Sequence, residues 1–271
     1  MTELVARPRT YLMCPPAHFA VEYVINPWMD PAADVSAATA LNQWSGLVDT
    51  LRELGHTVFT IEPEAGLPDM VFAANGSFTV DGKVYGAKFR YEQRQAEAGA
   101  YEKWFRAQGW TFTPATETNE GEGDFVYLPE RGLILGGYGF RTDARGVAEA
   151  AEVLGRPVVP LKLVDPRFYH LDTALASLSD DNIVYYPGAF SEASQAILRQ
   201  LFPDAVIADD ADALAFGLNL VSDGKNVVLN TEADGLAAKL EAAGFTTVRV
   251  ELAELKKSGG SVKCCIAELR D

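Results

Sequence analysis

A unit of strand and helix segments recurs five times along the 271 residues and places the strongest limit on how this chain can fold. In each unit an amphipathic segment ends near a glycine or an aromatic residue, and a short β-rich segment follows. Leu47, Leu51 and Leu54 show the i, i+4, i+7 spacing of a helix with one apolar face. The Val, Thr and Phe residues after each helix favour strands. The five predicted helices cover residues 44–55, 101–109, 147–155, 191–202 and 234–244.

Apparent hairpins precede four of these helices. Asp81-Gly82 and Asp223-Gly224 are strong signals for a tight turn between two antiparallel strands. Residues 130–132 and 180–182 hold the turns of the other two hairpins. The unit is therefore strand, strand, helix, strand, repeated at roughly 40 to 55 residues, and a period of that size suggests a radial array.

A closed array predicts how the two ends of the chain meet. Strands predicted at Thr10–Cys14 and Ser261–Leu269 are expected to share one sheet and so to close the circle. The sequence then predicts one α/β domain over residues 1–271, with an open α/β sheet of two lobes as the alternative. A chain of this length buries most of the surface that its unfolded form exposes, so the fold needs no disulfide or metal to hold it together.

The charge of the chain narrows the classes of partner. The formal net charge is -15 at pH 7, and such a surface repels the phosphates of nucleic acids and anionic lipids. We therefore expect no nucleic-acid and no membrane partner, and no segment approaches the roughly 18 apolar residues of a membrane-spanning helix. A cationic small molecule would be attracted. Association into a homo-oligomer is left open.

The chain has three cysteines: Cys14, Cys264 and Cys265. This count is low and odd, so it does not indicate a disulfide framework. Their count favours a reducing, cytoplasmic location. Cys264 follows the pair Gly259-Gly260, and glycines before a strand let a ligand approach the backbone closely. A thiol at the end of such a loop is predicted to be exposed to substrate, where a nearby cation favours the thiolate. The alternative, which we keep for Cys265 and Cys14, is a small buried residue.

His170 and Asp172 form the one histidine–carboxylate pair. Two residues apart on a strand they would point to the same face, which places an imidazole beside a carboxylate as acid–base catalysis requires. A purely structural pair is the alternative. The other two histidines have no such neighbourhood: we expect His56 at the surface and His18 in a loop.

Three further segments carry polar side chains in settings that suit a ligand. Glu120, Glu122 and Asp124 alternate with glycines, which indicates either a solvated turn or a carboxylate cluster that faces a cationic ligand. The spacing matches neither a calcium loop nor a zinc site, so we expect no metal. Asp69 and Asn75 flank an apolar run before the first hairpin, and a glycine-rich turn that is no phosphate-binding loop presents Arg141.

In this order, these segments resemble the guanidino-group-modifying superfamily. It includes arginine deiminases, dimethylarginine dimethylaminohydrolases, amidinotransferases and arginine dihydrolases. The residues that carry the resemblance are Gly260–Cys264, His170-Leu171-Asp172, Glu120–Asp124 and Arg141-Thr142. The resemblance covers nearly the whole chain and implies a five-bladed α/β propeller with pseudo-fivefold strand-strand-helix-strand repeats and its site on the axis.

The resemblance also implies roles for individual residues. Cys264 would be the nucleophile and His170 the general acid–base. Asp172 and either Glu120 or Glu122, with Glu120 favoured, would bind the guanidinium nitrogens. Arg141, with Arg90 as a second contact, would bind the substrate α-carboxylate.

One departure from the deiminase pattern concerns asparagines. Asn75 stands where arginine deiminases carry an aspartate, and the segment Ile25–Met29 with its Asn26 resembles the arginine dihydrolase branch. The predicted activity is therefore a cofactor-free, cysteine-dependent hydrolysis of the guanidinium group of arginine or of N-methylated arginine. The sequence leaves open the substrate's methylation and whether citrulline or ornithine is released. The alternatives are an amidinotransferase and a non-catalytic binding propeller.

Overall fold

A computed structural model describes residues 4–271, so the first three residues of the expected domain lie outside it. This part of the chain forms five three-stranded sheets, all built on one pattern. In each sheet the middle strand pairs antiparallel with one neighbour and parallel with the strand that follows a helix. The antiparallel neighbour is the preceding strand of a hairpin in four sheets and the last strand, β15, in the sheet of β1. A helical crossover is the connection that a parallel pair requires.

The sheets are, in strand order, β15–β1–β2, β3–β4–β5, β6–β7–β8, β9–β10–β11 and β12–β13–β14. Their strands are β1 (Thr10–Met13), β2 (Thr57–Thr60), β3 (Ser77–Val80), β4 (Lys83–Gly86), β5 (Thr111–Thr113), β6 (Phe125–Leu128), β7 (Leu133–Tyr138), β8 (Val158–Lys162), β9 (Leu175–Ser177), β10 (Ile183–Tyr185), β11 (Val206–Ile207), β12 (Val221–Ser222), β13 (Asn226–Asn230), β14 (Thr246–Val250) and β15 (Ala267–Glu268). All four predicted hairpins are confirmed.

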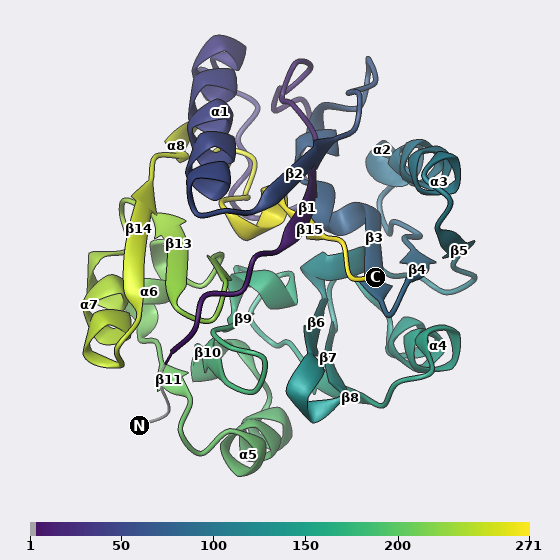
Figure 1. The fold of residues 1–271 in the computed structure, drawn as a ribbon. Helices are drawn as coiled ribbons and strands as arrows, with labels where there is room; N and C mark the ends of the chain where they lie inside the picture. The colour runs from purple at the N-terminus through teal and green to yellow at the C-terminus, as the bar shows by residue number, and fades with distance from the viewer. Residues whose placement is uncertain (1–3) are drawn as a thin grey trace.

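Long helices lie on the outside of the sheets, one per sheet (Figure 1). They are α1 (Ala37–Glu53), α3 (Glu97–Ala107), α4 (Ala144–Leu154), α5 (Glu192–Leu201) and α7 (Asp234–Ala242), and the shorter ones are α2 (Glu92–Gln95), α6 (Asp210–Leu214) and α8 (Ala253–Lys256). The five predicted helices are confirmed. In α1 the apolar stripe Trp44, Leu47 and Leu51 is buried, and the Ser36 side chain caps the first turn by accepting from Thr39 N at 3.2 Å.

The first and last strands share one sheet, as predicted. β15 pairs antiparallel with β1, with Leu12 opposite Ala267, and Leu269 N donates to Thr10 O at 2.8 Å. The predicted last strand was too long, however. Residues Lys263–Cys265 form a 3-10 turn, because the N–H groups of Cys265 and Ile266 donate to carbonyls three residues earlier and are lost to the sheet.

In four sheets a short 3-10 turn precedes the edge strand that pairs antiparallel with the middle strand. Several of these turns contact one another. These turns are Ala73–Gly76 before β3, Gly121–Gly123 before β6, Leu171–Thr173 before β9 and Lys263–Cys265 before β15. The turns and the residues beside them carry buried polar side chains. Side chains far apart in the sequence are thereby brought to one place.

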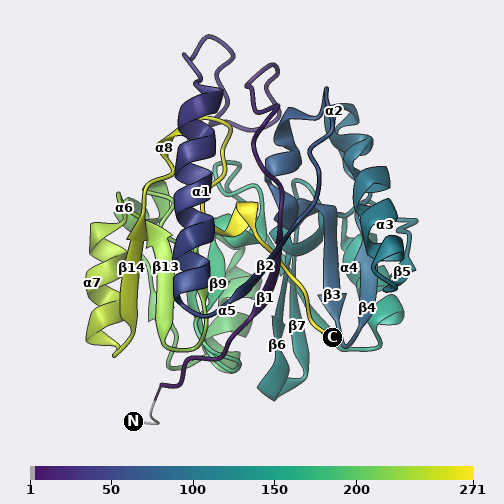
Figure 2. The same cartoon turned by 45° about the horizontal axis from the view of Figure 1, so that its top comes forward.

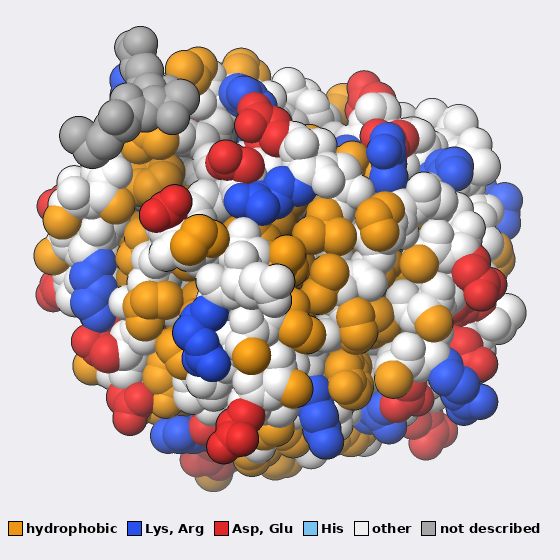
Figure 3. Space-filling model, turned by 90° about the horizontal axis from the view of Figure 1, so that it is seen from below, with side chains coloured by type: hydrophobic (Ala, Val, Ile, Leu, Met, Phe, Trp, Pro, Cys, Tyr) orange, Lys and Arg blue, Asp and Glu red, His pale blue; other side chains and the backbone are white. Residues whose placement is uncertain are grey.

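The connections of the chain divide between two ends of the molecule. The segment between β1 and α1 and the segment around α8 lie together at one end, and the residues just before β1 and the C-terminus lie toward the other (Figure 2). On the face seen in Figure 3, hydrophobic side chains extend across the middle and charges of both signs surround them. Among residues 4–271 no helix combines the length and apolar character needed to cross a membrane.

Candidate active site

Cys264 lies in the middle of the 3-10 turn before β15, with only 2% of its surface exposed. The thiol is therefore hidden from solvent, because the turn folds inward instead of ending a surface loop. The thiol donates to Asp172 Oδ2 at 3.3 Å. Burial, and then the neighbouring Asp172 carboxylate, raise the pKa of the Cys264 thiol well above its usual range.

Asp172 is equally buried. Burial raises the pKa of its carboxyl to about 7, although the charge of Lys263 opposes the rise. Its second oxygen, Oδ1, has no hydrogen-bond partner among residues 4–271. A buried carboxylate with a free oxygen beside a thiol suits a cationic ligand.

His170 contacts a different carboxylate from the one predicted. Its Nε2 lies 2.7 Å from Glu120 Oε2, because His170 precedes the 3-10 turn Leu171–Thr173 and is not on a strand. The strand alternation argument for His170 and Asp172 was therefore wrong, although both side chains are buried in the same region.

The pKa values of His170 and Glu120 are both lowered, which leaves the imidazole neutral and the carboxylate ionised. Burial lowers the pKa of His170 to about 4, although the hydrogen bond to Glu120 opposes the change. Burial also disfavours the ionised form of Glu120, but the Arg141 guanidinium and the His170 ring hold its pKa well below the usual range. An ionised carboxylate only accepts, so Nε2 of the neutral ring carries the proton. Nδ1 is left buried with no partner in the described chain.

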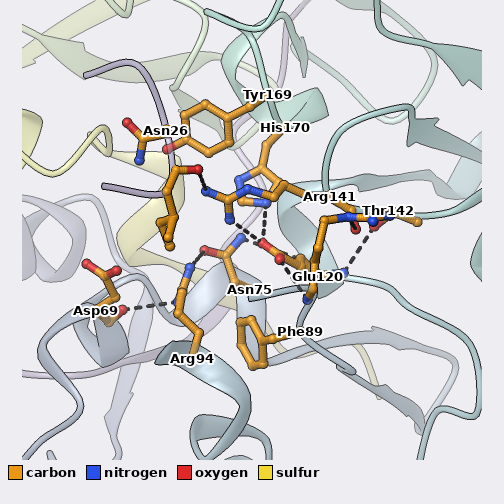
Figure 4. A network of polar contacts seen from close by, with 12 residues as sticks. Asn26, Asp69, Asn75, Phe89, Arg94, Glu120, Arg141, Thr142, Tyr169 and His170 are labelled. Carbon is orange, nitrogen blue, oxygen red and sulfur yellow. Dashed lines mark hydrogen bonds and ion pairs between the residues drawn. The ribbon is translucent and has the colours of Figure 1, made fainter. Parts of the chain in front are cut away.

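Arg141 is buried and converges with His170 on Glu120 (Figure 4). Its Nη1 lies 2.7 Å from Glu120 Oε2, its Nη2 donates to Ile25 O at 2.9 Å, and its guanidinium lies over the ring of Tyr169 at 4.6 Å. Arg90 is peripheral by contrast: its side chain pairs with Asp143, and its backbone N–H donates to Glu120 Oε1 at 3.2 Å.

Asn75 lies between Arg94 and the Glu120 segment (Figure 4). Its Oδ1 accepts from Arg94 Nη1 at 2.7 Å, and its Nδ2 donates to Glu120 O at 3.4 Å. Arg94 is a buried cation that sequence reasoning missed, and it also forms a two-pronged ion pair with Glu97. The available signal was Glu97 three residues later, a spacing at which opposite charges can pair, although Arg94 lies in α2 and Glu97 begins α3.

Asn26 and Asp69 connect the β1–α1 segment to the loop before Cys264. Asn26 Nδ2 donates to Ser258 O at 3.1 Å, and Asp69 accepts from both Ser258 Oγ and Tyr23 Oη. Gly259, with φ +84°, brings its backbone against Asn26, and a Cβ there would lie 2.7 Å from Asn26 Oδ1. These contacts hold the loop before Cys264 against the β1–α1 segment.

The acidic loop divides between separate environments. Glu120 joins His170 and Arg141, whereas Glu122 binds Lys263 Nζ at 2.7 Å and also Arg270. Asp124 is buried and accepts from Leu171 N at 3.0 Å, and burial raises its pKa well above the usual range. Of the two candidate glutamates, the structure brings Glu120 alone to the histidine.

Two further predictions have clear outcomes. His56 is buried and not at the surface, because its Nδ1 accepts from Arg9 N at 3.0 Å and its ring packs on Tyr11. Cys14 and Cys265 are buried free thiols, as predicted.

Asn219, on the loop before β12, is a further residue that the sequence did not reveal, and it contacts Cys264 Sγ at 3.1 Å. The available signal was that Asn219 precedes a predicted hairpin, as Asn75 and His170 do.

The cluster combines a thiol, a carboxyl group that accepts a hydrogen bond from it, an ionised glutamate and a neutral imidazole whose Nδ1 has no partner in the described chain. These are the groups of covalent catalysis with acid–base assistance. Among residues 4–271, no three His, Cys, Asp or Glu side chains gather as a metal site would need.

Fold and cluster together define an enzyme of the amidino-hydrolase class, which acts on C–N bonds. The chain belongs to the dimethylarginine dimethylaminohydrolase family, whose model, described as "N,N dimethylarginine dimethylhydrolase, eukaryotic", matches residues 16–271.

Relatives with known names fall into two groups. The chain is 55% identical over 263 residues to the N(G),N(G)-dimethylarginine dimethylaminohydrolase of Mycobacterium tuberculosis, across 97% of this chain and 86% of that one. It is 36% identical over 258 residues to the bifunctional arginine dihydrolase/ornithine cyclodeaminase ArgZ of Synechocystis sp.. That match covers 93% of this chain but 36% of the bifunctional enzyme, so the chain spans about a third of its length.

Solved structures show the same division. The N-terminal domain of ArgZ, as a cysteine-to-serine mutant bound to substrate, matches with a TM-score of 0.93 at 34% identity, over 97% of this chain and 98% of that one. A dimethylarginine dimethylaminohydrolase adduct with 4-chloro-2-hydroxymethylpyridine matches with a TM-score of 0.80 over 97% and 100% of the two chains. At 18% identity, this second match shows a shared fold.

Proposed function

We propose that this protein hydrolyses the guanidinium group of arginine or of an N-methylated arginine, with Cys264 as the nucleophile. The observation that carries the proposal is the buried thiol of Cys264 at 3.3 Å from Asp172, in one cluster with the His170–Glu120 pair. The cysteine-to-serine form of ArgZ bound to its substrate supports a cysteine in this role.

Binding of a guanidinium would supply the positive charge that the thiol lacks. In the structure the thiol faces a carboxylate and is protonated, since its pKa is raised. We propose that Glu120 and Asp172 bind the guanidinium nitrogens, and that the cation then lowers the pKa of Cys264. The thiol proton is transferred to Nδ1 of His170, which has no other partner in the described chain.

The thiolate then adds to the central guanidinium carbon and forms a neutral tetrahedral adduct. His170 returns its proton to the departing nitrogen, the C–N bond breaks, and an amine and a thiouronium remain. Water adds to that carbon as His170 takes its proton. The C–S bond breaks as the adduct's hydroxyl becomes the carbonyl of the ureido product and its proton restores the thiol. His170 then releases the proton taken from water to solvent.

Asn75 and Asn26 favour a second round of hydrolysis. A carboxylate at these positions would bind the cationic guanidinium and release the neutral ureido group, whereas an amide offers a donor and an acceptor to either. We therefore propose that the ureido product stays bound long enough to be hydrolysed to ornithine, ammonia and carbon dioxide. Asn75 is held in place for this by Arg94 at 2.7 Å.

The decisive experiment supplies arginine, monomethylarginine and dimethylarginine to the pure protein and measures citrulline, ornithine and the released amines. Ornithine from arginine supports two hydrolyses, and citrulline supports one. Cys264→Ser should abolish turnover, and Cys265→Ser is the matched control at the neighbouring buried thiol. A folded protein that turns over none of the three compounds would contradict the proposal. Products that carry the amidino group on added glycine or lysine would show amidinotransfer instead.

We also propose that the five sheets are the blades of one propeller domain over residues 1–271. Support comes from the common strand pattern of the sheets and from the β1–β15 pairing. The three free thiols support the proposed cytoplasmic location. The site roles of Glu120, Asp172, Arg141, Arg90, Asn26, Asp69 and Asn75 are part of the same proposal. Glu122 is left out of it, because both its oxygens are taken by Lys263 and Arg270.

A further inference from the structure

Asn219 lies on the loop between α6 and β12 with none of its surface exposed. We infer that it is a positioning residue for the nucleophile: its side-chain amide seats the turn that carries Cys264 and donates the hydrogen bond that favours the thiolate. The inference rests on the proposed function only in calling Cys264 the nucleophile.

The contacts of the Asn219 amide determine its orientation. Oδ1 accepts from Ser261 N at 3.2 Å and from Cys264 N at 3.1 Å. Backbone N–H groups only donate, so the oxygen must face them, and Nδ2 is left to face Cys264 Sγ and Asp172 O, both at 3.1 Å. Two acceptor and two donor sites are all that a carboxamide has, so the group is fully used.

The two side chains on Sγ have opposite electrostatic effects. Among residues 4–271, two side chains hydrogen-bond Sγ: Asp172 accepts a hydrogen bond from the thiol, and Asn219 donates one to the sulfur. Once the thiol has lost its proton, the Asp172 contact becomes a repulsion between two anions. The Asn219 contact then becomes a charge-assisted hydrogen bond, which is the stronger kind.

The repeat places Asn219 where the other sheets place site residues. Asn75 precedes β3, Glu120 precedes β6, His170 precedes β9 and Cys264 precedes β15, each by a few residues. Asn219 precedes β12 in the same way, so it is the contribution of the remaining sheet to the cluster. Its side chain bonds to two further segments, 261–264 and 172, which precede strands of two other sheets.

The test titrates Cys264 in the absence of any substrate. Mass spectrometry measures the rate of alkylation of Cys264 by iodoacetamide at a series of pH values. The pH at which this rate is half its maximum reports the pKa of the thiol, even if burial makes the maximum rate low. Asn219→Ala removes the donor, and we expect the midpoint to rise by about one pH unit, which is the effect of losing one hydrogen bond to a charged group. Asn219→Asp keeps the acceptors for Ser261 and Cys264, so it preserves the turn, and it should raise the midpoint further.

Asn230→Ala is the matched control. Asn230 is also buried, and its Nδ2 donates to Ala215 O and Phe216 O on the same connection, without contact to Cys264. It should lower the melting temperature as Asn219→Ala does and leave the alkylation midpoint unchanged. An unchanged midpoint in a folded Asn219 variant would overturn the inference.

One measurement needs no substitution at Asn219. In protein with isotope-labelled asparagine, one side-chain amide signal in the NMR spectrum should move with the Cys264 titration, and Cys264→Ser should abolish that movement. A titration that moves no asparagine side-chain signal would also refute the role. Neither readout depends on turnover. A protein inactive toward all guanidino compounds would therefore contradict the proposed function, while the alkylation and NMR titrations would still decide this inference.

Discussion

Glu120 and Glu122 are separated by one glycine, yet their carboxylates belong to different ion-pair clusters. Glu120 lies 2.7 Å from both His170 Nε2 and Arg141 Nη1, while Glu122 lies 2.7 Å from Lys263 Nζ and also contacts Arg270. The positive φ of Gly121, +54°, lets the backbone separate them. One loop therefore carries Glu120, which belongs to the candidate site, and Glu122, which pairs with cations outside it.

Glu120→Gln and Glu122→Gln should accordingly fail in different ways. Loss of the Glu120 charge removes the acid–base partner of His170, and we expect kcat to fall by about 10²- to 10³-fold. Loss of the Glu122 charge leaves two cations around a buried amide and should cost about 3 kcal/mol of unfolding free energy. Steady-state kinetics and urea unfolding of both variants separate the effects. Equal losses of kcat would contradict the division of roles.

Asp172→Asn should flatten the dependence of stability on pH. Burial raises the pKa of Asp172 from 3.8 to about 7, so between these values the folded state binds more protons than the unfolded state. Its contribution to stability is therefore present at low pH and is lost as pH rises toward 7, by on the order of 4 kcal/mol. Urea unfolding at pH 4 and pH 8 spans this window, and the difference in stability between the two should shrink in the variant.

His170→Gln should show the opposite sign. The pKa of His170 is lowered from 6.5 to about 4, so in this window the unfolded state binds the extra proton. The wild type should lose stability relative to the variant as pH falls from about 6.5 to 4, by on the order of 3 kcal/mol. The same unfolding series, extended to pH 4, tests it. A wild type that gains stability relative to the variant on acidification would show that His170 is charged in the folded state.

Gly123→Ala should disturb Asn75 without adding a charge. A Cβ at Gly123 would lie 2.2 Å from Asn75 Nδ2 and 3.3 Å from His170 Cγ, so the amide must move. We expect the yield of ornithine from arginine to fall relative to citrulline, as product analysis would show. Gly99→Ala is the control, since a Cβ there meets nothing within 4 Å and an alanine in helix α3 should stabilise by about 0.5–1 kcal/mol.

Local patterns were sufficient to predict the repeating elements. Asp81-Gly82 forms the predicted hairpin turn, with φ +50° and +73° at the two residues, and the leucine stripe of α1 is buried as its spacing indicated. The residue types and order around Cys264, His170 and Glu120 were sufficient to identify the family.

Contacts between distant segments determined what the sequence could not show. Cys264 turns inward because Asn219, 45 residues away, takes its backbone N–H. His56 is buried because it accepts from Arg9, 47 residues away. Periodicity describes only a residue's own helix or strand, so neither partner was predictable from spacing.

The pairing of β1 with β15 also has a consequence for the order of folding. Leu12 meets Ala267 across almost the whole chain, and the entropy of closing a loop rises with its length. Within each of the other four sheets, by contrast, the strands come from consecutive segments. We expect those four to form early and the first sheet to form late, since non-local pairings are slow. Cys264 lies just before β15, so its thiol is expected to reach its place only when β15 pairs with β1.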